Sequence, residues 1–167
     1  MSGEGARSIG FAPVVSDKTR LLVLGSLPGI ASLNAAQYYA HPRNAFWPIA
    51  AALTGQPLDT LPYEERLQGL LQSGIGLWDV LASAERSGSL DSAIRSPESA
   101  DLIALVRTLP RLEAIGFNGK AAAKIGRPIL EGHIGNVCLI ELPSTSPAYT
   151  MPLQAKLDLW RERLPAF

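Results

Sequence analysis

Four short apolar runs, separated by segments with a helical pattern, constrain the fold of this chain more than any other feature. The runs are LLVLG, IGLWDVL, LEAIGF and NVCLIEL, at residues 21–25, 75–81, 112–117 and 136–142. Each has the length and composition of a buried strand. Strands that alternate with helices form a parallel sheet with helices on both faces. We therefore predict one α/β domain over residues 1–167, with residues 1–20 as a partly loose N-terminal segment.

The segments between and after these runs predict the helices. Asn44 is a plausible N-cap for the first helix and Gly55 a plausible stop, while Ser96 or Ser99 lies near the start of the third. The stretch between the first strand and the first helix is a long loop, and loops of such length are often functional. The predicted helices cover residues 44–55, 62–74, 96–109, 118–130 and 152–164.

Composition excludes several kinds of site. Fifteen basic residues balance fifteen acidic ones, which counts against nonspecific phosphate attraction unless the basic side chains gather on one face. Cys138, in an apolar run, is expected to be a buried strand thiol, and a single cysteine forms no internal disulfide. With two histidines and no HExxH or CxxC pattern, no metal site is expected.

No apolar run is long enough to span a bilayer, and the N-terminus MSGEGARSIG has no signal-peptide core. A protein without membrane contact, in the cytoplasm, is therefore expected.

Small or polar residues follow all four predicted strands. They are GSLPG (25–29), Asp79, FNGK (117–120) and PSTSP (143–147). Ligands of parallel sheets bind outside the carboxyl ends of the strands, so a site is expected there. Each segment also has a simpler interpretation: a plain turn for GSLPG, a rigid turn for PSTSP, an N-cap for Asn118, and a surface or capping carboxylate, rather than a base, for Asp79.

The strongest local signal is YYAHPRN, residues 38–44. A tyrosine face can stack on a base, an interaction worth roughly 1–3 kcal/mol. Arg43 can meet a phosphate and Asn44 can orient a water molecule. The alternative has the tyrosines partly buried, His41 hydrogen-bonded within the loop and Asn44 capping the helix. That alternative does not explain why all these groups share one loop.

Taken together, the motifs resemble the hypoxanthine-DNA (deoxyinosine) glycosylase family of the uracil-DNA glycosylase superfamily over nearly the whole chain. The segments that carry the resemblance are GSLPGIASLNAAQYYAHPRNAFW, GIGLWDVLASAERSGSLDSAI, AIGFNGKAA, LPSTSPAYT and KLDLW. The resemblance implies a three-layer α/β/α sandwich with a short, largely parallel four-stranded sheet. It also implies hydrolysis of the N-glycosidic bond of a deaminated base, hypoxanthine favoured, flipped out of duplex or single-stranded DNA.

The resemblance implies a monofunctional base-excision-repair enzyme that leaves an abasic site and needs no cofactor. We also expect a monomer without a metal, associated with the nucleoid. The resemblance assigns catalysis to Asn44 and Asn118. Base binding falls to Tyr39, Gly25, Ser26 and Leu27. DNA binding falls to Pro28, Gly29, His41, Arg43, Lys120, Ser144, Thr145, Ser146, Pro147 and Tyr149.

Two positions depart from the wider superfamily. Leu27 stands where other branches carry an Asp or Asn that activates water, although an apolar residue is typical of this branch. Tyr149 stands in the wedge that enters the duplex, where Asn is common. Two alternatives therefore stay open: a glycosylase for uracil or for deaminated bases in general, and a DNA-binding relative with weak or no catalysis.

Overall fold

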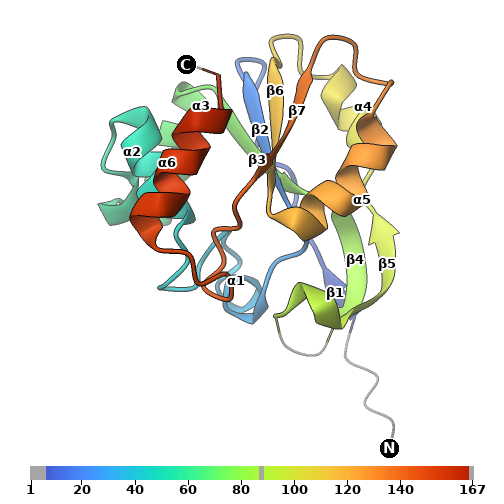
Figure 1. Cartoon of the computed structure of the whole chain (residues 1–167), viewed down its shortest axis with the longest axis horizontal. Helices are drawn as coiled ribbons and strands as arrows, with labels where there is room; N and C mark the ends of the chain where they lie inside the picture. The colour runs from blue at the N-terminus through green and yellow to red at the C-terminus, as the bar shows by residue number, and fades with distance from the viewer. Residues whose placement is uncertain (1–6, 87–88, 166–167) are drawn as a thin grey trace, which may run out of the picture.

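A four-stranded parallel sheet forms the centre of the computed structural model, which describes residues 7–86 and 89–165 (Figure 1). Its strands pair in the order β3-β2-β6-β7. This confirms the predicted parallel sheet, because each strand overlaps one of the four apolar runs. Every residue of the inner strand β2 is buried. The strands are β2 (Leu21–Gly25), β3 (Ile75–Asp79), β6 (Ala114–Asn118) and β7 (Cys138–Leu142).

Helices cover both faces of this sheet, which confirms the three-layer architecture (Figure 1). One apolar cluster joins the sheet to α2, α3 and α6, and a second joins its other face to α4 and α5. The helices are α1 (Ile30–Ala35), α2 (Phe46–Thr54), α3 (Tyr63–Gln72), α4 (Leu102–Arg107), α5 (Lys120–Leu130) and α6 (Leu153–Arg163), with single turns η1 (Leu58–Thr60) and η2 (Asp91–Ala93).

A second, antiparallel sheet was not predicted. It pairs β1 (Arg7–Ile9), β4 (Leu81–Arg86) and β5 (Ile94–Ser99) in the order β1-β4-β5. The predicted helix start at Ser96 or Ser99 is wrong, because those residues belong to β5. Asp101 caps α4 instead, and its Oδ1 accepts a hydrogen bond from Ala104 N at 3.1 Å.

The second sheet also holds part of the N-terminal segment that we expected to be partly loose. Residues 7–9 form β1, and Val14 makes an isolated bridge with Leu77 of β3. Residues 1–6 lie outside the described part of the chain.

Two further observations bear on the expectations from sequence. Cys138 is exposed, not buried, because it begins β7, which is an edge strand of the parallel sheet. Of the helices within the described residues, none is both long and apolar enough to cross a bilayer.

Candidate active site

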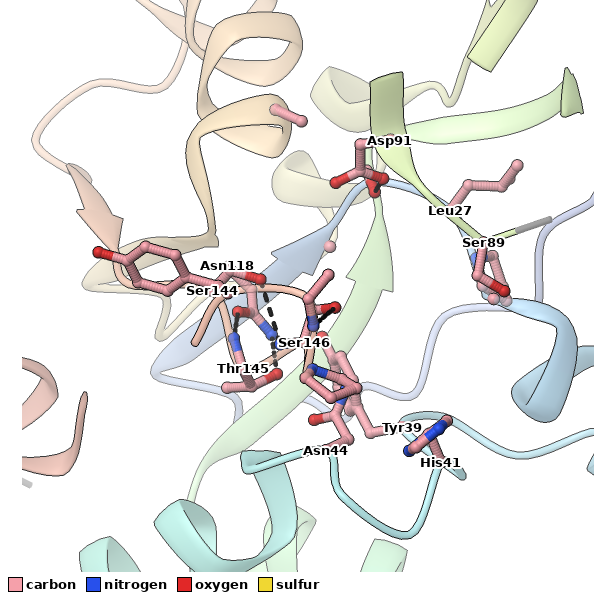
Figure 2. Close-up of a pocket in the computed structure, with 18 of the residues that line it drawn as sticks. Leu27, Tyr39, His41, Asn44, Ser89, Asp91, Asn118, Ser144, Thr145 and Ser146 are labelled. Carbon is pink, nitrogen blue, oxygen red and sulfur yellow. Dashed lines mark hydrogen bonds between the residues drawn. The ribbon is translucent and has the colours of Figure 1, made fainter. Parts of the chain in front are cut away.

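A cavity of about 800 Å³ opens where the four parallel strands end (Figure 2). Asn118 and Thr145 lie on one side of it, and Leu27, Ser89 and Asp91 on the other. Every residue assigned a role from sequence lines the cavity except Arg43, which is exposed and lies outside the lining. The sequence-predicted lining residues are Gly25, Ser26, Leu27, Pro28, Gly29, Tyr39, His41, Asn44, Asn118, Lys120, Ser144, Thr145, Ser146, Pro147 and Tyr149.

Asn118, at the end of β6, is bound at both ends of its amide. Its Nδ2 donates to Thr145 Oγ1 at 2.9 Å, and its Oδ1 accepts from Thr145 N at 2.9 Å (Figure 2). Thr145 is almost fully buried. The N-cap interpretation of Asn118 is therefore wrong, because Gly119 occupies that position with a φ of 105°. These two hydrogen bonds hold the Ser144–Pro147 loop against the end of β6.

Asn44 faces the same loop from the other side. Its Oδ1 accepts from Phe46 N at 2.9 Å, and the neighbouring Ala45 N donates to Thr145 O at 2.9 Å. The formal N-cap of α2 is Ala45, so the predicted cap is displaced by one residue. Asn44 still pairs one N–H of the first helical turn, as a cap does. Its Nδ2 group has no hydrogen-bond partner among the described residues and is free for a ligand.

The remainder of the YYAHPRN loop is a structural support for this geometry. Tyr38 is buried, donates from Oη to Ala12 O at 3.0 Å and accepts at its carbonyl from Trp47 Nε1 at 3.1 Å. His41 Nδ1 accepts from Arg43 N at 3.0 Å, which closes a tight turn. These hydrogen bonds agree with the simpler interpretation of Tyr38 and His41, although both residues line the cavity together with Tyr39 and Asn44.

Tyr39 has an unusual conformation for a tyrosine, with a φ of 55°. Its ring stacks on Phe46, with 4.2 Å between ring centroids. Its Oη is buried and makes no hydrogen bond with a described residue. Burial and, second, the charge of Asp79 raise the pKa of this hydroxyl, and the nearby Asn118 amide offsets part of the rise. A strained backbone that holds an unpaired polar group is typical of a functional site.

Asp79 is a site residue whose importance the sequence interpretation underestimated. It lines the cavity at the end of β3, is only 5% exposed, and pairs in register with Gly25 of β2. A surface position is therefore wrong. A Cβ on Gly25 would lie 2.6 Å from Asp79 Oδ1, so only glycine leaves room for the carboxyl group.

The environment of Asp79 favours its neutral form. Its Oδ2 is buried without a hydrogen-bond partner among the described residues. Burial raises the pKa of Asp79 from 3.8 to about 7, with a lowering contribution from Arg86 and a raising one from Asp91. The sequence contained one signal for this role of Asp79: it ends a predicted strand, and the neighbouring predicted strand ends in a glycine, Gly25.

Arg86 of β4 was also missed, because the second sheet was not predicted. Its side chain is buried, and Nη2 donates to the carbonyl oxygens of Leu27 and Pro28. Its Nη1 lies 3.5 Å from Asp91 Oδ1, which accepts from Ser26 Oγ at 2.5 Å. The first strand-end loop is therefore held in shape by the second sheet.

Lys156 of α6 supports the Ser144–Pro147 loop. Lys156 Nζ donates to Ser146 O at 3.1 Å and lies 5.3 Å from the centroid of the Tyr149 ring. Burial lowers the pKa of Lys156. Tyr149 is 44% exposed at the cavity rim. An exposed ring on a supported turn is suited to contact with a nucleic acid base.

The described residues include no group of three or more His, Cys, Asp or Glu side chains that could hold a metal ion. The polar groups that line the cavity include amides, hydroxyls and the buried carboxyl group of Asp79. They can orient water and bind a polar ring.

Comparison with known proteins gives consistent matches over most of the chain. The model of the "Uracil DNA glycosylase superfamily" matches residues 12–167. A hypoxanthine DNA glycosylase from Methanosarcina barkeri is 37% identical over 153 residues, which cover 92% of this chain and 95% of the relative. A hypoxanthine DNA glycosylase from Methanosarcina acetivorans is 40% identical over 139 residues, 83% of this chain and 86% of the relative.

A solved structure agrees with these matches. It is the solution NMR structure of a candidate uracil DNA glycosylase from Methanosarcina acetivorans, with a TM-score of 0.79 and 35% identity. The alignment covers 91% of this chain and 94% of that one.

Proposed function

The chain belongs to the uracil DNA glycosylase superfamily, and from this premise we propose that it is a monofunctional DNA glycosylase for deaminated bases. It hydrolyses the N-glycosidic bond of a base flipped out of DNA, with hypoxanthine as the favoured base, and leaves an abasic site for base excision repair. The choice of hypoxanthine rests on the names of the two curated relatives.

One observation supports this proposal above the others: Asn44 and Asn118 line a single cavity, and Thr145 bonds both to Asn118 and to the backbone of Ala45, the residue after Asn44. The cavity, of about 800 Å³, lies within the size range of small-molecule sites. Glycosylases must take the base out of the stack to reach the C1′ atom. Two amides fixed around such a cavity can act on the base and on the attacking water.

The hydrogen-bonding capacity of each amide suggests its role. Asn118 uses both ends of its amide on Thr145, which leaves one N–H of Nδ2 to donate to the base. Asn44 Oδ1 accepts one bond from Phe46 N and keeps a second lone pair for a water hydrogen. We therefore assign water positioning to Asn44 and base stabilisation to Asn118.

Leu27 leaves the first loop without a carboxylate general base at the position that other branches use. Deaminated bases are good leaving groups, because the negative charge that develops spreads into the ring carbonyl. Hydrogen bonds that strengthen as the ring becomes anionic then lower the barrier. Orientation of the water by an amide is sufficient for such a leaving group.

The DNA interface in this proposal surrounds the cavity mouth. Tyr149 fills the gap that the flipped base leaves, and the Ser144–Pro147 loop contacts the phosphate backbone through its hydroxyls and N–H groups. Arg43 and Lys120 are both exposed and supply positive charge. Lys120 lines the cavity, whereas Arg43 lies outside the lining. The enzyme acts as a monomer, in the cytoplasm, on nucleoid DNA.

The replacement Asn44→Ala tests the catalytic assignment. The rate of abasic-site formation in an inosine duplex, read as alkali-dependent strand cleavage, is expected to fall about 100-fold or more. The lost bond to Phe46 N costs only about 1 kcal/mol of stability. Asn44→Asp is the matched control, since a carboxylate keeps both the Phe46 bond and the acceptor for water. Full activity in Asn44→Ala contradicts the assignment.

Competition among inosine, uracil and xanthine duplexes tests the choice of base. A preference for inosine is expected, and equal excision of uracil would support the broader specificity instead. DNA binding without any abasic site, with all three substrates, would favour a relative that kept the fold and lost the chemistry.

A further inference from the structure

The cavity floor contains a pair of polar groups that the proposed mechanism does not use. Asp79 Oδ2 and Tyr39 Oη are both buried, and neither has a hydrogen-bond partner among the described residues. Both residues line the cavity. They are also neighbours, because a Cβ on Gly25 would lie 2.6 Å from Asp79 Oδ1 and 3.4 Å from Tyr39 Oη. Buried polar atoms without partners are costly and rare, so this pair calls for a ligand.

The charged groups around Asp79 do not neutralise it. Arg86, on the adjacent β4, forms no hydrogen bond or ion pair with it: its Nη groups contact Leu27 O, Pro28 O and Asp91, and its buried Nε has no partner among the described residues. The Arg86 charge lowers the pKa of Asp79, but by less than burial raises it. An isolated carboxylate in such a place is strongly disfavoured. Burial accordingly raises the pKa of Asp79 to about 7.

Other titratable groups face the same place. Tyr38 and Tyr39 approach from the loop before α2, and Asp91 from η2 adds repulsion. The remaining charged or titratable groups along the cavity wall are His41, Lys120, Glu141, Tyr149 and Arg163.

We propose that Asp79 is a catalytic residue that acts in its neutral form, donating a hydrogen bond to the ring carbonyl oxygen of the departing base. The inference rests on the proposed function and adds, beside the Asn118 amide, a second hydrogen-bond donor to the departing base. Tyr39 Oη, beside Asp79, is a further donor for the same edge of the base. Both unpartnered groups would then find their partner in the flipped base.

The chemical step balances without transfer of the Asp79 proton. The bond between C1′ and the ring nitrogen breaks, and its electron pair leaves on the base, which spreads the charge onto the carbonyl oxygen. The water oxygen forms the new bond to C1′ and releases one proton to solvent, and the anionic base takes up one proton. Asp79 keeps its own proton throughout and stabilises the charge that develops.

The neutral form is required by the direction of charge movement. An ionised carboxylate next to the base would repel the developing anion, most strongly in a buried site of low dielectric constant. A neutral carboxyl group donates instead, and its hydrogen bond becomes stronger as the oxygen gains charge. Activity is therefore expected to decrease as Asp79 loses its proton.

The test is the single-turnover rate on an inosine duplex between about pH 5.5 and 8.5, for the native protein, Asp79→Asn and Asp79→Leu. The native rate is expected to fall about 10-fold per pH unit above the ionisation of Asp79. Asp79→Asn, a permanent donor, is expected to keep activity within about 10-fold at low pH and to lose the pH dependence. Asp79→Leu is expected to be about 100-fold slower than the native protein at low pH and to lack the pH dependence. Asp158→Asn, the same change at an exposed carboxylate on α6, is the matched control.

Several outcomes overturn the inference. One is an Asp79→Asn profile with the native pH dependence. Another is a native rate that rises through pH 7 while Asp79→Asn is inactive. That result would indicate that Asp79 acts in its ionised form as a general base. If the variants do not fold, a carboxyl-carbon NMR titration of the native protein decides: a midpoint near 7 supports it, and one near the ordinary 3.8 overturns it. If the native protein leaves no abasic site in inosine, uracil or xanthine duplexes at any pH, the proposed function fails, and the inference with it.

Discussion

The two sides of the cavity differ in how completely their polar groups are paired. On the Asn118 side, both ends of the amide are bound to Thr145, and Thr145 O accepts from Ala45 N. On the Asp79 side, the carboxyl Oδ2 and Tyr39 Oη are buried without partners among the described residues. The first side has its geometry fixed before DNA arrives, whereas the second has hydrogen bonds still to make. The folded protein thus pairs the polar groups of the Asn118 side, while those of the Asp79 side are left to bind the substrate.

The difference has an energetic consequence. Paired buried groups stabilise the fold modestly, at about 1 kcal/mol per hydrogen bond, whereas an unpaired one costs about 1–3 kcal/mol. The Asp79 side therefore destabilises the free protein. Such a cost is expected where function and stability compete for the same atoms.

The largest effect is expected from Asp79→Asn, measured as stability against pH. Because the folded pKa is raised from 3.8 to about 7, native stability is fully present below pH 4 and is lost as the pH rises to 7. The variant lacks this loss. Relative to the variant, the native protein should lose about 2–4 kcal/mol between these limits, at roughly 1.4 kcal/mol per pKa unit. Urea denaturation at about pH 4 and 8 measures it, and parallel curves would show that the carboxyl group is paired or solvated.

The next effect is expected from Asn118→Ala and has the opposite sign. It leaves the buried N–H and hydroxyl of Thr145 without partners, at a cost of about 2–3 kcal/mol. Asn118→Asp is the control, since a carboxylate can accept from both groups. Chemical denaturation at neutral pH separates the two variants. An alanine variant as stable as the native protein would mean that solvent replaces the amide.

The smallest effect comes from removing one hydroxyl on each side. Thr145→Val is expected to lose about 1 kcal/mol, because the hydroxyl bonds to Asn118 Nδ2. Tyr39→Phe is expected to leave stability unchanged or slightly higher, since its hydroxyl has no partner to lose. Thermal unfolding of the DNA-free variants makes the comparison. Equal losses in both would remove the contrast between the two sides.

Much of this architecture was accessible from sequence, because the signals are local. Each strand of the parallel sheet overlaps an apolar run, and a parallel sheet brings its carboxyl ends to one rim. GSLPG, the YYAHPRN loop, FNGK and PSTSP could therefore be assigned to one cavity before any coordinates. Gly55 ends α2 with a φ of 69°, as a glycine stop predicts.

The features that escaped prediction depend on contacts between distant segments. β5 could be mistaken for the start of a helix because its pairing with β4 is not visible in its own residues. Cys138 is exposed because the strand order leaves β7 at an edge. The cap at Asn118 was misassigned because its amide bonds to Thr145, 27 residues away, in preference to its own helix.

The sequence by itself determined which polar groups reach the cavity: their positions at strand ends follow from the order of strands and helices. Only the tertiary structure decided which of them are paired. Asn118 finds Thr145, while Asp79 is buried against Gly25 with no partner for its Oδ2 among the described residues. The reason is physical, since burial and hydrogen bonding are properties of the assembled neighbourhood and not of a residue's place in the chain.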